Sequence, residues 1–253
     1  MVTTVAGTTC QLGESRTTSD NPWPIGFAWG EPWHIGSAAF WVDQCQQADA
    51  ADLRLGRDLF EEVVACLLGG WGVPGDIGVA AFVRLQEERL LEPPVDSGAI
   101  ESALNEPLVV AGRTQPVRYR FPKQRSVRIA GAAAVLDAAD MPAEPVALRN
   151  WLAENVPGVG LKTASWIVRN LAADAPVAVI DVHVRRAGLG AGFFDPVWQL
   201  PRDYSRFEDA FVEVARRGDV LPGQLDHAVW STLSSVPGHT RVVLCGNRVA
   251  LDD

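Results

Sequence analysis

The sequence predicts a mostly α-helical fold. Apolar residues recur at helical spacing through most of the chain, for example over 56–68. Strand-like runs are scarce, and only about 175–180 and 241–245 carry them. Breaks rich in Pro and Gly separate the helical stretches, and we find neither an internal repeat nor a low-complexity segment. A chain of 253 residues could form one large domain or two small ones, and we expect two packed helical subdomains.

The first part of the chain combines an irregular segment with a helical subdomain. Residues 1–20 are polar, and 21–41 hold four tryptophans among prolines and glycines. We expect an irregular, Trp-rich segment over 1–50 that packs onto the core, with base stacking as the alternative. A helical subdomain over 51–125 follows. Its helices are expected at about 56–68, 76–91 and 99–111, with breaks at Gly69–Gly75 and Pro93-Pro94.

The second subdomain is expected over 126–253, ending in a C-terminal tail. Pro122 precedes a helix of about 123–138 that has a buried apolar stripe. The stretch from Ala175 to Val184 is expected to be extended and to become helical near Arg185. Further helices are expected at about 146–155, 161–173, 205–217 and 222–234.

Composition limits the classes of protein. The chain has 253 residues and 47% hydrophobic content, enough for a real core. No apolar run reaches the roughly 18 residues that span a bilayer, and Met1–Ala6 shows no secretion signal. Four cysteines lie far apart without a C-x-x-C pair, which fits neither zinc nor an iron–sulfur cluster. We expect a cytoplasmic monomer with reduced thiols, no membrane contact, no metal and no cofactor.

The charge is acidic overall and basic in one place. The formal net charge of −9 at pH 7 argues against a protein that simply coats DNA. A basic face on an acidic body can still bind DNA while limiting non-specific adhesion, and Arg120 and Lys123 are our candidate contacts. The alternative is a solvated, arginine-rich helix start. Six basic residues follow one another with no acid between them: Arg113, Arg118, Arg120, Lys123, Arg125 and Arg128.

The run Val156-Pro157-Gly158-Val159-Gly160 predicts a tight hairpin between two helices. Glycines on both sides of an apolar residue permit a sharp turn with outward-facing N–H groups. The next helix starts at once and adds its unpaired N–H groups and positive dipole end. Gly158, Val159 and Gly160 therefore predict a site for one DNA backbone phosphate. A turn that merely joins two packed helices is the alternative.

Lys162 and Asp181 are the candidate catalytic pair. The positive end of the helix dipole disfavours an ammonium at Lys162, which favours the free amine that a nucleophile needs. The only other lysine is Lys123, so a Schiff-base mechanism has two side-chain candidates. Asp181 follows an apolar run and is expected to be half buried, where it can stabilise positive charge on a sugar carbon. The alternatives are a surface lysine and an aspartate that caps the helix near Val182.

These residues resemble a known family. The run 156–164 together with Ile180-Asp181-Val182-His183 resembles the helix-hairpin-helix-Gly/Pro-Asp superfamily of DNA glycosylases. The separation of Lys162 and Asp181 is similar to that in the 8-oxoguanine DNA glycosylase branch. The resemblance implies an active site in the cleft between the subdomains. Lys162 would attack C1′, Asp181 would be the essential carboxylate, and His183 would donate to a phosphate.

The resemblance also implies how an extruded base is held. Enzymes of this kind flip the target nucleotide out of the duplex and grip its base with aromatic faces. Trp166 lies one turn after Lys162 and would form one wall of the base pocket. Trp71, on a glycine-rich turn, is a candidate wedge for the vacated stack, with a core tryptophan as the alternative.

The late helix departs from the family pattern. Asp226, His227 and Trp230 fall on the helix that reads the base in the family. Asp226-His227 stands where an amide would be expected, and Ser231 where an aromatic would lie. Asp226 can accept from an amino group and His227 can donate to a carbonyl, which fits several bases.

Three functions follow from these residues. The first is a DNA glycosylase, with AP-lyase cleavage as an optional second step, that acts on 8-oxoguanine in base excision repair. The second keeps the chemistry but excises a bulky modified base, such as glucosylated hydroxymethylcytosine in phage DNA, as an antiviral defence. The third is a helix-hairpin-helix module that binds DNA without catalysis. For the enzymes the partner is double-stranded DNA containing a modified base, and Asp181 discriminates, because a pure binder gains nothing from a carboxylate near phosphates.

Overall fold

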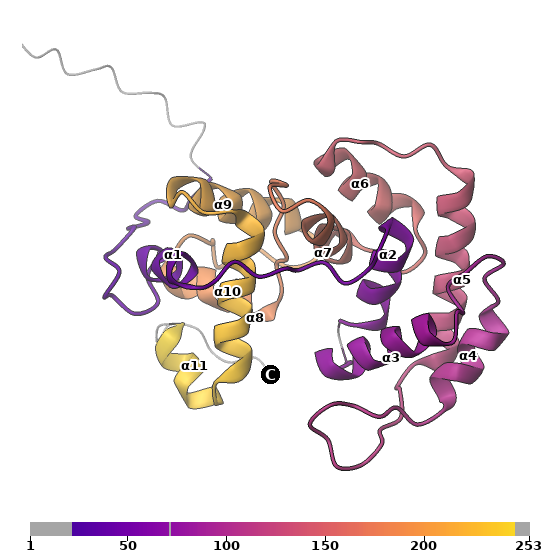
Figure 1. Ribbon diagram of the computed structural model, residues 1–253. Helices are drawn as coiled ribbons and strands as arrows, with labels where there is room; N and C mark the ends of the chain where they lie inside the picture. The colour runs from indigo at the N-terminus through magenta and orange to yellow at the C-terminus, as the bar shows by residue number, and fades with distance from the viewer. Residues whose placement is uncertain (1–21, 71, 246–253) are drawn as a thin grey trace, which may run out of the picture.

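The computed structural model describes residues 22–70 and 72–245, and within these ranges the chain forms eleven helices and no strand (Figure 1). A single β-bridge joins Leu108 to Val117 in this part of the chain. The expected mostly α-helical fold is confirmed. The helices are α1 (Ala38–Gln47), α2 (Leu59–Leu68), α3 (Gly75–Glu87), α4 (Ser97–Asn105), α5 (Pro122–Ala138), α6 (Pro145–Asn155), α7 (Leu161–Leu171), α8 (Val182–Ala191), α9 (Tyr204–Arg217), α10 (Pro222–Ser235) and α11 (Gly238–Leu244).

Two hydrophobic clusters organise these helices. The first is built from α2 to α7 and ends at Val177, and the second joins α1 to α8, α9 and α10. Figure 1 shows the two groups of helices side by side, with α7 between them. The chain passes between the clusters through the segment 48–58 and again through 172–181. The boundary expected near residue 125 does not coincide with this division, because α5 and α6 pack in the first cluster.

Two sequence expectations are wrong. The segment 1–50 was expected to be irregular, yet α1 occupies its last part, with Ser37 accepting a hydrogen bond from the Phe40 N–H at 3.1 Å. The prolines and glycines before Ser37 favoured an irregular segment, although Trp41 and Val42 are buried on one face of a helix. The β-like run 241–245 is mostly helical, because backbone bonds within α11 satisfy groups that have no partner strand in the described residues.

The segment 48–58 is held at two points. Near its start, Ala51 and Gln224 of α10 exchange two hydrogen bonds of 3.1 and 3.0 Å. Near its end, a carboxylate oxygen of the buried Glu62 on α2 accepts from the N–H groups of Leu55 at 2.9 Å and Gly56 at 2.7 Å. The segment is therefore fastened to one helix of each cluster.

A buried ion pair also joins the clusters. Arg149 of α6 contacts Glu208 of α9 at 2.5 Å, and both side chains are buried. Glu208 also accepts from the Ser165 hydroxyl at 2.7 Å and from the Ala178 N–H at 3.2 Å. Burial raises the pKa of Glu208, and Arg149 opposes that rise. Removing one partner would leave an uncompensated buried charge, so this pair resists separation of the clusters.

Close packing around α8 requires a glycine in that helix. Phe193 and Phe194 are buried after α8, and their ring centroids lie 4.8 Å apart. A Cβ at Gly188 would lie 2.2 Å from Phe194 Cδ2 and 2.6 Å from Phe193 Cε2. Gly188 therefore lets α8, the helix that Asp181 precedes, approach this aromatic cluster.

We expect Gly188→Ala to lower the free energy of unfolding by about 1–3 kcal/mol, because the added methyl group forces the two rings to move. Urea unfolding followed by circular dichroism measures the change. Gly75→Ala in the first turn of α3 is the matched control, because no atom lies within 4 Å of its added Cβ. A Gly188→Ala protein as stable as Gly75→Ala would contradict the packing described here.

Candidate DNA-binding and catalytic site

The hairpin between α6 and α7 is anchored by its apolar residues. Val156 and Val159 are buried, and the Val159 N–H donates to the Val156 carbonyl at 3.1 Å. Gly158 between them has φ +82°, the left-handed region that favours glycine. Gly160 begins α7 without any side chain capping the helix. This leaves N–H groups of the first turn available for an anion.

Lys162 lies in the first turn of α7 and lines a pocket of about 390 Å³. The walls come from the end of α2, the start of α5, the hairpin at Gly158 and the first turns of α7. We call this cavity the Lys162 pocket. Besides Lys162, its polar and aromatic side chains include Gln124, Arg125, Arg128, Thr163 and Trp166.

Trp166 is fixed in the Lys162 pocket by the end of α2. A Cβ at Gly69 would lie 2.9 Å from Trp166 Cη2, so the indole packs directly on the backbone of that residue. The structure thus brings three of the predicted site residues, Gly158, Lys162 and Trp166, to one cavity.

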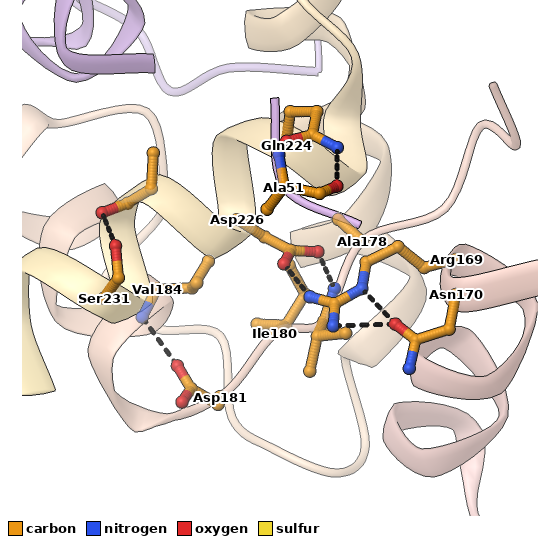
Figure 2. A network of polar contacts seen from close by, with 12 residues as sticks. Ala51, Arg169, Asn170, Ala178, Ile180, Asp181, Val184, Gln224, Asp226 and Ser231 are labelled. Atoms are coloured by element: carbon orange, nitrogen blue, oxygen red, sulfur yellow. Dashed lines mark hydrogen bonds and ion pairs between the residues drawn. The ribbon is translucent and has the colours of Figure 1, made fainter. Parts of the chain in front are cut away.

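Asp181 is the N-cap of α8. Its Oδ1 accepts hydrogen bonds of 2.8 Å from the N–H groups of His183 and Val184, and Figure 2 shows the bond to Val184. The residues before it are buried, with Ala178 and Ile180 fully inside the second cluster. The capping interpretation is therefore confirmed. Capping fixes the carboxylate and is compatible with a catalytic role for it.

His183 follows Asp181 in the first turn of α8 and is partly buried. Its Nδ1 has no hydrogen-bond partner among the described residues. Burial lowers the pKa of His183, against the raising effect of Asp181, and Arg241 and Arg186 lower it further. A neutral imidazole keeps one N–H to donate to a DNA phosphate, which stays a prediction.

The residue that sequence reasoning assigned to base reading, Asp226, is instead part of the core. Asp226 is 1% exposed and forms a buried ion pair with Arg169 of α7 (Figure 2). Its other oxygen accepts from the Val179 N–H at 2.7 Å. Both oxygens are thus occupied inside the protein, and the expectation that Asp226 binds the base is wrong. Gly223 makes the pairing possible, since its Cβ would lie 2.6 Å from Arg169 Cγ.

The ion pair belongs to a larger network of polar side chains between the clusters. The Arg169 guanidinium donates to Asn170 Oδ1 at 2.9 and 3.1 Å, as Figure 2 shows. Asn170 in turn donates to Glu62 of α2 at 2.6 Å. This network of polar side chains therefore connects α2, α7, α10 and the segment that leads to Asp181. The sequence offered no signal for it, because Arg169 and Asp226 are 57 residues apart.

His227 and Trp230 lie on α10, and neither lines the Lys162 pocket. Their ring centroids are 5.8 Å apart, and Trp230 is 43% exposed. Burial and the nearby Arg169 lower the pKa of His227. His227 lines a second hollow of about 280 Å³ under the segment 48–51, and neither Lys162 nor Trp166 lines it. Of the predicted base-binding residues, Trp166 thus lines one cavity and His227 the other, whereas Asp226 and Trp230 line neither.

Arg120 and Lys123, two further DNA-contact candidates, are sequence neighbours of Phe121 and Gln124, which line the Lys162 pocket. Arg120 and Lys123 are exposed, and the Arg120 guanidinium lies 5.0 Å from the ring centroid of Phe121. Trp71, the candidate wedge, lies outside the described residues. Arg125 and Arg128 line the pocket itself, which the sequence reasoning did not single out. Their spacing of three along a buried helix face is the signal that could have found them.

No group of three or more His, Cys, Asp or Glu side chains in the described part of the chain could hold a metal ion. Among the same residues no helix is long and apolar enough to cross a membrane.

Comparison with known proteins decides the family. The model of the 8-oxoguanine DNA glycosylase family matches residues 46–220. The chain belongs to the 8-oxoguanine DNA glycosylase family. The resemblance drawn from the hairpin, Lys162 and Asp181 is thereby confirmed, and so is the expectation of a DNA glycosylase. The match extends over most of both clusters, well beyond the motif itself.

Relatives and solved structures agree with this membership. An 8-oxoguanine DNA glycosylase/AP lyase from Korarchaeum cryptofilum is 26% identical over 193 residues, which cover 70% of this chain and 80% of that protein. One from Thermotoga maritima is 27% identical over 182 residues, covering 69% and 79%. The Methanocaldococcus jannaschii glycosylase/lyase, solved with a 15mer DNA containing 8-oxoguanine, shares the fold with a TM-score of 0.52 at 20% identity, covering 79% of this chain and 90% of that one. The Thermotoga maritima enzyme structure gives a TM-score of 0.51 at 21% identity, covering 79% and 89%.

The ionisation of Asp226 makes stability depend on pH. Burial raises the pKa of Asp226 to about 7, against the lowering effect of Arg169. Below that pH the native state therefore keeps a proton on Asp226, which then contacts Arg169 as a neutral carboxyl group, whereas the same aspartate in the unfolded chain has released its proton. The contribution of protonated Asp226 to the free energy of unfolding is present at low pH and is lost as the pH rises through 7. We expect the free energy of unfolding of the wild type to fall, relative to Asp226→Asn, by about 1–2 kcal/mol between pH 5.5 and 7.5.

Urea unfolding at several pH values measures these slopes. Asp209→Asn, an exposed aspartate on α9, should keep the slope of the wild type. Equal slopes for the wild type and Asp226→Asn would show that Asp226 stays ionised throughout this range.

Proposed function

We propose that this protein excises 8-oxoguanine from duplex DNA, with Lys162 as the nucleophile and Asp181 as the essential carboxylate. The observation that carries the proposal is the Lys162 pocket, where an amine, an aromatic wall and a phosphate-binding hairpin meet. Family membership supports the glycosylase chemistry, and the relatives named above supply the expectation of 8-oxoguanine as the base.

The chemistry begins with attack of the neutral Lys162 amine on C1′ of the extruded nucleotide. The glycosidic bond breaks as the new C–N bond forms, and the base leaves with the electron pair and takes up a proton. Positive charge builds on the sugar during this step, and the fixed carboxylate of Asp181 stabilises it. Ring opening then gives an imine between Lys162 and C1′. Loss of a C2′ proton from this imine expels the 3′ phosphate and completes an AP-lyase step.

The flipped base is expected to stack on Trp166. Stacking on an aromatic face contributes roughly 1–3 kcal/mol per base, enough to offset much of the cost of extrusion. Contact with Gly69 fixes the indole before DNA binds, so little ordering is needed. His227 and Trp230 stay candidates for base contact from the α10 side, and His227 lines the hollow beside the segment 48–51.

Phosphate contacts are expected from the hairpin and its surroundings. Gly158, Val159 and Gly160 would bind through backbone N–H groups, while His183, Arg120 and Lys123 would bind through side chains. The buried side chain of Val159 serves to hold the hairpin in place.

Borohydride reduction traps the imine as a covalent protein–DNA complex visible on a denaturing gel. We expect the wild type to form this complex with an 8-oxoguanine:cytosine duplex and Lys162→Gln to form none, because the amide cannot add to C1′. Lys123 is the only other lysine, so Lys123→Gln is the matched control. This variant should still form the covalent complex, because it keeps Lys162. A Lys162→Gln protein that still gives the complex would remove Lys162 as the nucleophile.

Asp181→Asn separates the two roles of Asp181. Asparagine also caps helices well, so the variant should remain folded, with an unfolding free energy within about 1 kcal/mol of the wild type. The lost charge should reduce the single-turnover excision rate by roughly a hundredfold or more. Excision at the wild-type rate would leave Asp181 with a capping role only.

The same excision assay also tests the alternative target. Glucosylated phage DNA and an 8-oxoguanine:cytosine duplex are treated in parallel, and alkali-sensitive strand breaks are counted. Breakage of the oxidised duplex alone supports the proposal. Breakage of the phage DNA alone would transfer the same mechanism to a bulky modified base and an antiviral role.

A further inference from the structure

The Lys162 pocket carries positive charge without a counter-charge. Three cationic side chains line it, those of Arg125, Arg128 and Lys162. No carboxylate is among its lining residues. None of the ion pairs in the described part of the chain involves any of the three. Elsewhere in the same chain the buried arginines Arg149 and Arg169 each face an acid.

Arg125 is the buried member of this set. It is 8% exposed, and its Nε has no hydrogen-bond partner among the described residues. One Nη donates weakly to the Gly69 carbonyl at 3.4 Å, and the guanidinium lies 5.9 Å from the ring centroid of Phe121. A buried guanidinium with an open N–H and no acid nearby costs stability unless a ligand supplies an acceptor.

Arg128 lies one turn further along α5 and covers the hairpin. A Cβ at Gly158 would lie 2.4 Å from Arg128 Cδ and 2.6 Å from its Nε. The glycine therefore lets the guanidinium rest directly on the hairpin backbone, beside the uncapped start of α7 at Gly160. The pocket is thus lined both by the arginines of α5 and by residues of the first turn of α7, the helix end that no side chain caps.

We propose that Arg125 and Arg128 bind a phosphate of the DNA backbone inside the Lys162 pocket. The inference rests on the proposed function, because the target nucleotide must enter this pocket for a phosphate to reach it. A phosphodiester satisfies the charge and the donors together, since guanidinium groups form strong charge-assisted bonds to phosphate oxygens. The base that stacks on Trp166 is neutral and would by itself leave these charges unbalanced, whereas a phosphate of the DNA backbone balances them. The structure thus adds an α5 contact to those expected from the hairpin.

The test pairs Arg128→Gln with DNA in which single phosphates are replaced by neutral methylphosphonates. The duplex carries a tetrahydrofuran abasic analogue at the target position, and one methylphosphonate is placed in turn at each of the phosphates flanking it. Fluorescence anisotropy gives the dissociation constant of the full-length protein for each duplex. Because no base is excised from the analogue, binding is measured separately from catalysis.

We expect one methylphosphonate position to weaken wild-type binding about tenfold, the effect of losing one charge-assisted hydrogen-bonded contact. Arg128→Gln should weaken binding to the unmodified duplex by a similar factor. At that one position the methylphosphonate should not weaken binding of the Arg128→Gln variant further, because the variant has already lost the contact with this phosphate. Arg206 is an exposed arginine on α9, and Arg206→Gln is the control. The methylphosphonate at that position should weaken its binding about tenfold, as it does for the wild type.

Two results overturn the proposal. In the first, each methylphosphonate weakens binding of Arg128→Gln by the same factor as binding of the wild type, at every position. In the second, no methylphosphonate weakens binding of the wild type. Arg125→Met gives an independent check and should show the same non-additivity, with its thermal unfolding measured to confirm that it folds. Excision of 8-oxoguanine without this coupling refutes the phosphate contact alone, whereas coupling without excision refutes the proposed substrate alone.

Discussion

Arg169 and Asp226 form a buried ion pair that holds α7, α10 and the segment before Asp181 in one arrangement. Both charges have left water, which is costly, so the pair is stable only while each keeps its partner and its additional hydrogen bonds. Because α7 carries Lys162 and the segment carries Asp181, the two candidate catalytic groups are positioned by the same contact. The residues that touch DNA or substrate can then vary in detail without loss of the framework.

The Lys162 pocket shows the opposite electrostatic design. Asp226 is paired with Arg169 within the protein, whereas no carboxylate lines the pocket that holds Arg125. A protein with a net charge of −9 thus keeps a local positive field where a polyanion must be recognised. The surplus acid on the rest of the surface limits binding elsewhere.

Local features of the site could be predicted from the sequence. The hairpin follows from the conformational freedom of Gly158, and the cap at Asp181 follows from the residues next to it, so neither needs long-range information. Asp226 could not be placed, because its partner Arg169 comes from a distant helix and an exposed and a buried aspartate look alike in sequence. The helix at Trp41 was missed for a related reason, since the prolines before it outweighed a short apolar stripe. Arg125 and Arg128 were seen as a charge run, and only the fold shows that Arg128 rests on the hairpin and that Arg125 lines the same pocket.

The fastening of residues 48–58 has a consequence for the DNA. With Ala51 held to α10 and Gly56 held to α2, the segment is a short strap whose length limits how far the two clusters can separate. The buried pairs across the interface resist the same movement. Because the two clusters resist separation, a duplex of unfavourable shape has to bend to fit the protein. Selectivity then depends partly on how easily the DNA deforms, and a damaged or mismatched step yields at lower cost than an intact one.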